Sequence, residues 1–403
     1  MALAVAAVAI ALLAIRPRRI PEWVWPAGGA LLLVALRDEP LAAAGRAIAA
    51  QWNIFCFIAG LMVLSAAAQL SGAFRWIADL VVERAGGSRR RLFVLVFLAC
   101  SAVTVLLSND ATAIALTPIV YQAVRRHTEN VKVYLFGCVF AANTASFGLP
   151  FSNPANVLIL PRARLGPYVW HLGPPQLAAI AINLAAFLFF FRRELEGRYE
   201  PARLYPPQGR TRATLFTLAV VAAGYFAALV WGWPLGPVAL AGGACAAVTA
   251  GAGIGPALRG ISWRTLTLLG GLFVLLDAVT RAGFLQWAVV QLDRATQLGS
   301  LAAIGAAATG SALLSNALNN LPVAVAASYV VTRVSAAHLA YPLILGVDVG
   351  PNLLTAGSLA TLLWLGIVRG YGIRIGALEY LRLGALVVPA TLAAGILWLA
   401  FAR

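Results

Sequence analysis

The chain has 403 residues, of which 61% are hydrophobic and only 11% are charged, and its formal net charge is +16. A soluble domain carries about a quarter of charged residues, so this composition excludes an ordinary soluble fold. The apolar residues form runs of about twenty, the length that a helix needs to cross a ~30 Å hydrocarbon layer. The composition therefore indicates an all-α polytopic membrane protein.

The basic residues lie in the connections between the apolar runs and form no single patch of the kind that binds nucleic acid, so no nucleic-acid partner is expected. This is the distribution of charge that orients membrane spans. The residues concerned are Arg16, Arg18, Arg19, Arg84, Arg89, Arg90, Arg91, Arg125, Arg126, Lys132, Arg192, Arg193, Arg198, Arg203, Arg210 and Arg212.

The apolar runs predict about ten transmembrane helices and two re-entrant hairpins. The hairpins are expected at 92–124 and 299–331, where polar residues interrupt an apolar segment that is short for two crossings. Two tightly connected full spans are the alternative for each hairpin. The predicted spans lie near 2–15, 24–36, 52–70, 133–160, 175–191, 214–231, 235–253, 265–280, 340–365 and 384–401.

Arginine counting predicts the orientation of these spans. The arginine-rich segments 71–91, 125–132, 192–213 and 366–383 alternate onto one side, which we expect to be cytoplasmic. Both termini then lie on the external side of an inner (plasma) membrane. The first apolar run lacks a basic segment before it and a cleavage site, so we interpret it as a short span and not as a signal peptide.

The sequence also repeats itself in order. Residues 59–64 match 270–275 at an offset of 211, and Leu-Leu-Ser-Asn occurs at 106–109 and at 313–316. Five predicted crossings separate equivalent points, so the second half is expected to be inserted upside down, as in many secondary transporters. The predicted organisation is a first inverted repeat with spans 1–5, a cytoplasmic linker, and a second inverted repeat with spans 6–10, at 1–192, 193–213 and 214–403.

Four polar breaks interrupt the apolar segments at equivalent places in the two halves. Gly and Pro unwind helices there, and unwound backbone at membrane depth is tolerated only inside protein or beside a water-filled cavity. We therefore expect the breaks to converge on a substrate site, although each asparagine alone could simply join helices. The candidate binding residues are Asn109, Thr112, Asn143, Ser146, Ser152, Asn153, Asn156, Asn316, Asn319, Asn320, Asn352, Thr355 and Ser358.

Three carboxylates, Asp110, Asp277 and Asp348, fall within predicted membrane segments, where a carboxylate is costly and functional by default. Asp110 and Asp348 lie in the polar breaks, and a carboxyl group in a low dielectric binds a proton more readily, so both are candidates for proton coupling. Asp277 has a structural explanation, because Arg281 lies one helical turn away and can pair with it.

No other chemistry is indicated. The three histidines, His127, His171 and His338, are scattered in predicted loops, and the four cysteines have no paired spacing, so we expect no metal site and no cofactor. The membrane cysteines are interpreted as packing residues. A P-loop signature is missing from the sequence, and no nucleophile–base pair lies at membrane depth, so the chain is not expected to be an enzyme.

The polar breaks resemble those of the arsenite permease family (arsenical pump membrane proteins) of the ion transporter superfamily. The resemblance rests on Asp348-Val349-Gly350-Pro351, on the run Gly357 to Leu365, on Asn109-Asp110 followed by Leu116 to Val120, and on Asn319-Asn320-Leu321-Pro322. It covers about Trp52 to Phe401. The chain departs from the family at Asn143-Thr144-Ala145-Ser146, where the pattern often reads Asp-Thr-Ala-Ser, which leaves one carboxylate fewer for proton coupling.

This resemblance implies efflux of trivalent arsenite and antimonite, driven by proton exchange or membrane potential and in some members with a separate ATPase subunit. Arsenous acid is an uncharged hydroxide at neutral pH, so it needs hydrogen-bond partners and no counter-charge. The breaks offer amides and hydroxyls but no Lys or Arg. The alternatives are a carboxylate (citrate-like) transporter and a sodium/proton antiporter of the same superfamily.

Overall fold

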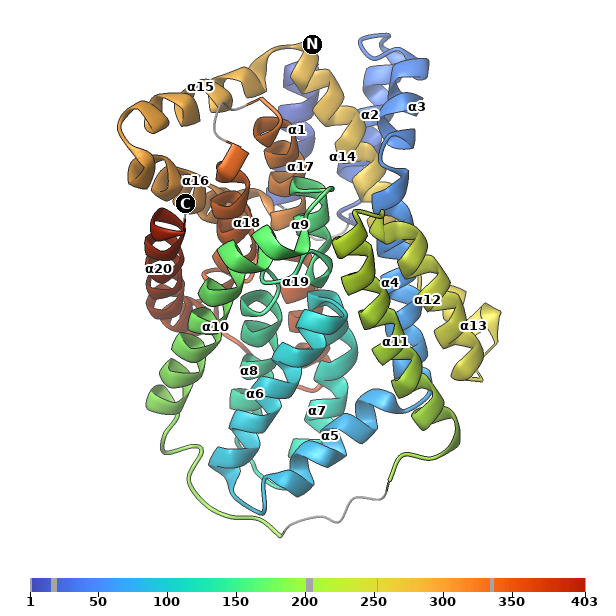
Figure 1. The fold of residues 1–403 in the computed structure, drawn as a ribbon, viewed down its shortest axis with the longest axis vertical. Helices are drawn as coiled ribbons and strands as arrows, with labels where there is room; N and C mark the ends of the chain where they lie inside the picture. The colour runs from blue at the N-terminus through green and yellow to red at the C-terminus, as the bar shows by residue number, and fades with distance from the viewer. Residues whose placement is uncertain (1, 16–19, 201–205, 252, 334–336, 403) are drawn as a thin grey trace.

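The computed structural model describes residues 2–15, 20–200, 206–251, 253–333 and 337–402, so Arg16, Arg18, Arg19, Arg203 and both terminal residues lie outside it. Within the described residues the regular structure is helical, apart from one isolated bridge between Ser88 and Arg198 (Figure 1). The all-α polytopic prediction is confirmed. Six described helices are long and apolar enough to cross a membrane: α4 (Trp52–Leu70), α10 (Leu165–Phe190), α11 (Gly209–Trp231), α14 (Trp263–Arg281), α16 (Ser300–Leu318) and α20 (Ala377–Phe401).

Each of the predicted spans 133–160 and 340–365 is two short helices around an unwound segment. Pro150, Pro154 and Pro351 interrupt the helical hydrogen bonding in these segments because proline has no N–H. The first pair is α8 (Val131–Thr144) and α9 (Pro154–Ile159), with a 3₁₀ turn at Pro150–Ser152 between them. The second is α18 (Ala340–Val349) and α19 (Leu359–Gly370), with a 3₁₀ turn at Gly350–Asn352.

Two helical hairpins occupy the segments where re-entrant hairpins are predicted. The first joins α6 (Arg89–Leu106) to a π-helical turn, Ala111–Leu116, which continues as α7 (Thr117–Val124). The second joins α16 to α17 (Asn320–Val331) through Asn319, which has φ +79°. A positive φ is uncommon for a residue other than glycine, and asparagine tolerates it better than most.

Amphipathic helices connect the apolar ones, and the apolar runs did not predict them because charged residues are mixed into each. They are α3 (Leu41–Ala49), α5 (Ala73–Arg84) and α15 (Phe284–Gln297). Gly72 and Gly283, which are 211 residues apart, precede α5 and α15 with φ near +79° and +78°, a conformation that glycine adopts without strain. Helix α5 lies across the lower end of the molecule and α15 across the upper end (Figure 1).

Helix α10 starts ten residues before the predicted span 175–191, because Pro174 and Pro175 lie inside it and do not end it. His171 therefore lies in a helix and not in a loop, which corrects the sequence prediction, and its ring stacks on Tyr341 at 4.2 Å between ring centroids. The indole of Trp398 in α20 donates a hydrogen bond to the backbone oxygen of Trp170 at 3.0 Å. Packing against α20 thus holds the early part of α10.

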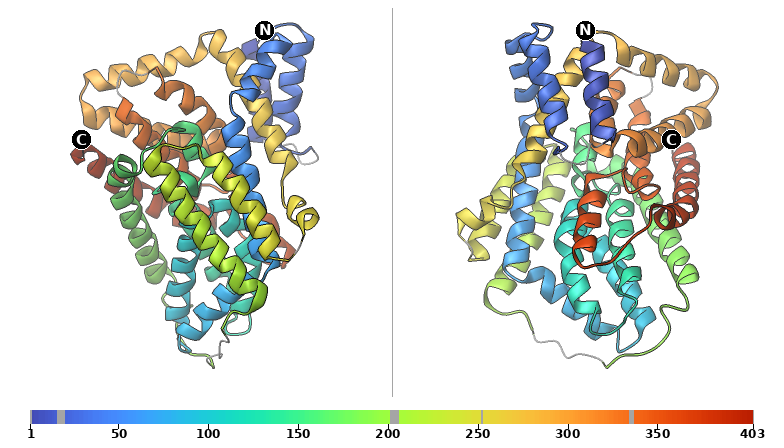
Figure 2. Two further views of the ribbon diagram at one scale, coloured as in Figure 1. Left: turned by 45° about the vertical axis from the view of Figure 1, so that its right-hand side comes forward. Right: turned by 180° about the vertical axis from the view of Figure 1, so that it is seen from behind.

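The helices pack in two groups. In one, α4, α11 and α12 (Leu235–Thr249) pack together, and the ring of Phe55 in α4 contacts that of Phe273 in α14. Helix α14 packs on α1 (Ala2–Ile15), α2 (Val24–Ala35) and α3, and it also contacts α15 and α17. Gly60 allows close approach in this group, since a Cβ there would overlap the backbone of Ala239. In the other group, α6 packs on α8, α16 on α18 and α10 on α20. The views in Figure 2 place α1, α2 and α3 at one end and α5 at the opposite end.

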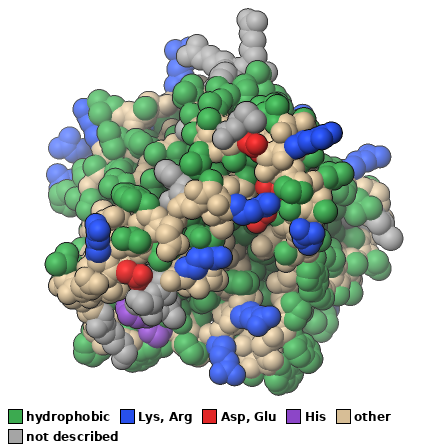
Figure 3. Space-filling model, turned by 90° about the horizontal axis from the view of Figure 1, so that it is seen from above, with side chains coloured by type: hydrophobic (Ala, Val, Ile, Leu, Met, Phe, Trp, Pro, Cys, Tyr) green, Lys and Arg blue, Asp and Glu red, His purple; other side chains and the backbone are tan. Residues whose placement is uncertain are grey.

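The remaining helices are short: α13 (Ile254–Leu258) precedes α14, and a 3₁₀ turn at Ala337–Leu339 precedes α18. Seen from above, the Lys and Arg side chains are spread over the face, singly or in small groups, among apolar and other side chains (Figure 3). On this face, therefore, the basic side chains do not gather into one patch.

A charged cluster joins the α2–α3 connection to the end of α14. Arg281 binds both Glu39 and Asp277, and the pairing of Asp277 with Arg281 at 2.5 Å agrees with its structural interpretation. Glu39 lies in a loop as predicted, but its side chain is fully buried, whereas that of Arg281 is 45% exposed. Arg281 binds Oε1 of Glu39, and the other carboxylate oxygen, Oε2, has no hydrogen-bond partner among the described residues.

Replacing Arg281 should therefore destabilise the fold, because it would leave the buried Glu39 carboxylate without its cation. We expect Arg281→Met to lower the free energy of unfolding by about 2 kcal/mol, measured as a lower thermal midpoint in detergent. Adding Glu39→Gln should recover most of the loss. Arg294→Met, at an exposed position on α15, is the control and should be neutral. Equal melting of Arg281→Met and the native protein would contradict the role of this pair.

Candidate functional site

The carboxylate of Asp348 lies at the contact between the two broken helices. Asp348 lies in the last turn of α18 and is 1% exposed. The Ser146 hydroxyl donates to one carboxylate oxygen at 2.9 Å, and the Asn153 amide donates to the other at 2.6 Å. Both donors come from the unwound segment between α8 and α9. Buried polar groups need such partners, and here residues about 200 positions apart in the chain supply them.

Two asparagines join the same broken helices a short way from Asp348. The Asn143 amide donates to the Asn352 side-chain oxygen and to the Thr361 hydroxyl, both at 3.0 Å. The Asn352 amide donates in turn to the Thr144 hydroxyl at 2.8 Å. All four side chains are buried. The network therefore closes the contact between the α8–α9 and α18–α19 segments without leaving room for a ligand between these groups.

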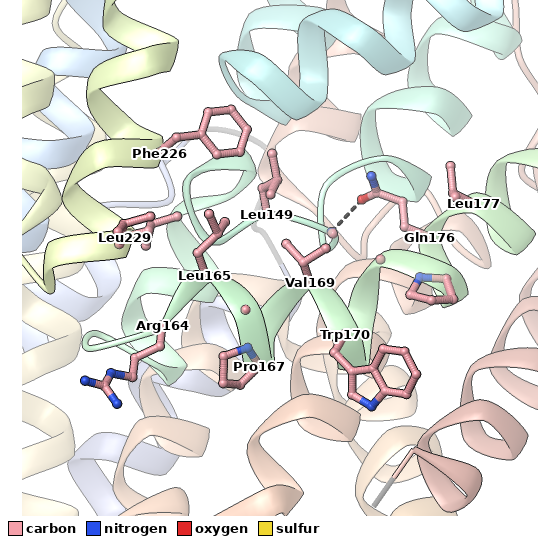
Figure 4. Close-up of a pocket in the computed structure, with 15 residues that line it drawn as sticks. Leu149, Arg164, Leu165, Pro167, Val169, Trp170, Gln176, Leu177, Phe226 and Leu229 are labelled. Atoms are coloured by element: carbon pink, nitrogen blue, oxygen red, sulfur yellow. Dashed lines mark hydrogen bonds between the residues drawn. The ribbon is translucent and has the colours of Figure 1, made fainter.

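The unwound α8–α9 segment is fixed by further hydrogen bonds. The Asn156 amide donates to the backbone oxygens of Ser146 and Leu149, at 2.7 and 3.2 Å. The Gly148 N–H donates to the Gln176 side chain at 2.5 Å (Figure 4). The side-chain oxygen of Asn156 is buried without a hydrogen-bond partner in the described residues. Asn156 and Gln176 thus hold the backbone that presents Ser146 and Asn153.

Hydrogen bonds from Asn316 join the second hairpin to the second broken helix. The Asn316 amide donates to the backbone oxygens of Ala312 and Gly350, both at 2.8 Å, and its oxygen accepts from the Leu354 N–H. The Asn319 side chain caps α17 by accepting from the Leu321 N–H. Asn316 therefore uses both of its polar side-chain atoms within the fold, and Asn319 uses its side-chain oxygen.

The first hairpin likewise uses several candidates internally. The Thr112 hydroxyl bonds to that of Thr104 at 2.8 Å, and the Ser152 hydroxyl donates to the backbone oxygen of Val105 at 2.8 Å. Asn109 accepts from the N–H of Asp110 at 2.9 Å. The carboxylate of Asp110 is different, since it makes no hydrogen bond or ion pair to the described residues. It is thus free to meet a proton or a solute.

Asp110 faces two adjoining cavities. The larger, about 170 Å³, lies between α4, the π-helical turn, the start of α14 and α19; its polar side chains come from Ser65, Gln69, Ser108, Asp110, Ser262 and Thr265. The smaller, about 20 Å³, holds the candidate residues Asn109, Asp110, Asn153, Asn320 and Ser358. The smaller cavity has room for one water molecule and the larger for several, or for a small solute.

The structure therefore brings most of the predicted residues together in two adjoining places, whereas Thr112, Ser152, Asn316 and Asn319 make contacts elsewhere. One is the sealed network around Asp348, and the other is the pair of cavities beside Asp110. Asn153 belongs to both, because it lines the small cavity and donates to Asp348. Thr355 is half-buried and lines neither cavity. The Ser358 hydroxyl is buried without a partner among the described residues, and it lines the small cavity.

The charge of the cavities restricts what they can hold. Among the described residues that line them, Asp110 is the charged one, and none is Lys, Arg or His. Hydroxyl and amide groups supply the remaining polarity. A small neutral solute bearing hydroxyls finds hydrogen-bond partners here, whereas an anion would meet a carboxylate and no cation.

Sequence analysis missed several polar residues at these places, among them Ser65, Gln69, Ser262, Thr265 and Thr361. Ser65 and Gln69 are four residues apart on an otherwise apolar helix, so they share one face, and that spacing was the available signal. The spacing of the cysteines in the sequence also gave no sign that two of them are in contact: the sulfur atoms of Cys100 and Cys138 are 3.5 Å apart. Both cysteines are fully buried, and they line neither cavity beside Asp110.

The asparagine network should be needed for stability. Asn352→Ala would remove the donor to the buried Thr144 hydroxyl and one of the two acceptors of the Asn143 amide. We expect it to cost about 2 kcal/mol, measured as a lower melting midpoint. Thr355→Ala, three residues along and half-buried, is the matched control and should change stability by less than about 0.5 kcal/mol. Comparable effects of the two changes would show that the network has no special role.

Comparisons with known proteins agree with this architecture. A family model described as citrate transporter matches residues 1–350. An arsenical pump membrane protein of Escherichia coli is 30% identical over 83% of this chain and 82% of its own length, and one of Yersinia enterocolitica is 29% identical over 83% of each. The crystal structure of the Alcanivorax borkumensis YdaH transporter covers 94% of this chain and 97% of its own, with a TM-score of 0.59 and 15% identity, which shows a shared fold.

Proposed function

The chain belongs to the arsenical pump membrane protein (arsenite permease) family and is a membrane transporter of that kind, not an enzyme. We propose that it exports trivalent arsenite and antimonite from the cytoplasm in exchange for protons. The relatives at about 29% identity, which are named arsenical pump membrane proteins, support the choice of substrate. The localisation that follows is the inner membrane of the cell.

The observation that carries this proposal is the cavity beside Asp110. Arsenite and antimonite are neutral hydroxides at physiological pH, and a neutral hydroxide needs donors and acceptors but no counter-charge. Ser65, Gln69 and Thr265 supply such groups in a cavity of about 170 Å³ without Lys, Arg or His among its described lining residues. The substrate hydroxyls would exchange hydrogen bonds with these side chains as they leave water.

Proton coupling is assigned to the two aspartates in different ways. The Asp110 carboxylate adjoins the substrate cavity and has no partner among the described residues, so a proton and the substrate compete directly for the space beside it. Asp348 is enclosed by Ser146 and Asn153, so its protonation would alter the contact between the broken helices. Asn153 adjoins both groups and gives them a physical connection.

The transport movement follows from the packing. We infer that the chain consists of two inverted repeats, 1–192 and 214–403, connected by the linker 193–213, each with a re-entrant hairpin. The same succession of amphipathic helix, hairpin, broken helix and long final helix in each half supports this division. The group that contains the hairpins would move against the group of α4, α11, α12 and α14, and the substrate cavity lies between them.

The cavity is assigned to the cytoplasmic side. Gln69, which lines it, lies at the end of α4 that leads to α5, and the arginine distribution places that end in the cytoplasm. In the described conformation a cytoplasmic solute would therefore reach Asp110, while the network around Asp348 is closed. Both chain termini would lie on the external side.

A carboxylate transporter is the second candidate, because a family model described as citrate transporter matches residues 1–350. A sodium/proton antiporter of the same superfamily is a further alternative. The charge of the cavities disfavours a carboxylate substrate, since no described lining residue is cationic. Flux measurements on the purified or overexpressed protein decide among the arsenite exporter, the carboxylate transporter and the sodium/proton antiporter.

Everted membrane vesicles test the proposal directly. With an acid interior, vesicles that contain the protein should accumulate arsenite and antimonite, and dissipating the pH gradient should stop this uptake. Expression should also restore growth on arsenite to a cell that lacks its own efflux system. Citrate-dependent or sodium-dependent flux without arsenite flux would reject the proposal in favour of an alternative.

Asp110 and Asp277 give a matched pair for the coupling role, because both aspartates lie in apolar segments but Asp277 pairs with Arg281 at the surface. We expect Asp110→Asn to abolish arsenite/proton exchange at normal membrane abundance, since the amide cannot carry a proton through the cycle. Asp277→Asn should retain exchange. Unchanged pH-dependent export in Asp110→Asn would remove this residue from the mechanism.

Gln69 tests the substrate cavity. We expect Gln69→Leu to raise the KM for arsenite roughly fivefold, which corresponds to the loss of about one hydrogen bond to a neutral group, with a smaller effect on kcat. Gln51→Leu, just before the start of the same helix and outside the cavity, is the control. If Gln69→Leu transports arsenite with the native KM, the substrate does not contact this face of α4.

A further inference from the structure

A second, larger cavity lies on the outside of the helix bundle and takes no part in the proposed transport path. It is a groove of about 1030 Å³ between the first half of α10 and the last turns of α11. Its walls are apolar, as the side chains of Leu149, Leu165, Val169, Phe226 and Leu229 show in Figure 4. A neutral hydroxide would find few hydrogen-bond partners here, so the groove does not suit the transported solute.

The groove lies in the half of the membrane away from the arginine-rich linker, because that linker follows the last turn of α10 and precedes the first turn of α11. Exposed tryptophans mark its level. Trp170 lines the groove with 53% of its surface exposed, and Trp231 and Trp233 pack together at the end of α11 with ring centroids 5.0 Å apart. Tryptophan is enriched where hydrocarbon meets the lipid headgroups.

One cation stands at the rim of this apolar groove. Arg164 precedes the first residue of α10 and lines the groove, and its side chain is exposed. Its guanidinium makes no hydrogen bond or ion pair to the described residues, although its backbone oxygen accepts from the Tyr168 N–H. Figure 4 shows its guanidinium directed away from the apolar side chains. An apolar groove with a free guanidinium at the headgroup level matches the two ends of a phospholipid.

We propose that this groove is a binding site for an anionic phospholipid, with an acyl chain along α10 and α11 and the headgroup phosphate on Arg164. The lipid would then contact both packing groups, because α10 packs on α20 whereas α11 packs with α4 and α12. The inner end of the groove is the Gly148–Gln176 hydrogen bond, which belongs to the unwound segment that also supplies Ser146 and Asn153 to Asp348.

The test uses the intact protein in nanodiscs and native mass spectrometry with phosphatidylglycerol and phosphatidylcholine as probes. We expect one phosphatidylglycerol to be retained in preference to phosphatidylcholine. Arg164→Gln should weaken the retention roughly fivefold, the contribution of one cation beside an anionic headgroup. Arg162→Gln is the matched control, since Arg162 is exposed two residues away but does not line the groove; it should keep the native preference.

A second pair of variants tests the apolar part. Val230→Trp should fill the groove and remove the retained lipid, whereas Val220→Trp, exposed on the same helix but outside the groove, should not. Equal retention of the two lipids, or equal loss in Arg162→Gln and Arg164→Gln, would overturn the proposal. A change in subunit number in Val230→Trp without loss of lipid would assign the groove to a second copy and overturn it too. Arsenite flux is measured separately, so its absence would not affect this outcome.

Discussion

Hydrogen-bond satisfaction at membrane depth is the constraint on which the structure depends. Hydrocarbon offers no partner to an unwound backbone or to a carboxylate, so each broken helix must find its partners inside the protein. Here the two breaks satisfy each other: Ser146 and Asn153 of one bind Asp348 of the other, and Asn143 binds Asn352. The unwound backbone itself finds its partners within each half, in the side chains of Asn156 and Gln176 for the first break and of Asn316 for the second.

The same constraint separates the two aspartates that sequence analysis treated alike. Asp348 is enclosed and accepts hydrogen bonds on both carboxylate oxygens, so its role is to hold the two broken helices together. Asp110 has no such donors and adjoins a cavity. An unpaired carboxylate at membrane depth destabilises the fold, so its presence points to a function. Binding and release of a proton or a solute would be such a function.

The positions of the breaks and of the two helical turns could be predicted because their signal in the sequence is local. Gly, Pro and Asn inside an apolar run stand out at any position, and Asn319 and Pro351 mark turns where the structure has them. The amphipathic helices α5 and α15 were not predicted, because charged residues interrupt the apolar runs on which the prediction relied. Which asparagines hold the fold together and which line the cavities could not be predicted. This depends on contacts between distant parts of the chain, such as that between Asn143 and Asn352, 209 residues apart.

The central claim is that a neutral hydroxide leaves through this protein in exchange for protons. Purified protein in liposomes with a trapped pH indicator measures both movements at once. When arsenite is loaded inside and diluted outside, the account predicts that arsenite efflux acidifies the interior in proportion to the arsenite lost, and that citrate or sodium gradients do not. Arsenite efflux without proton movement, or proton movement that follows sodium or citrate alone, would contradict it.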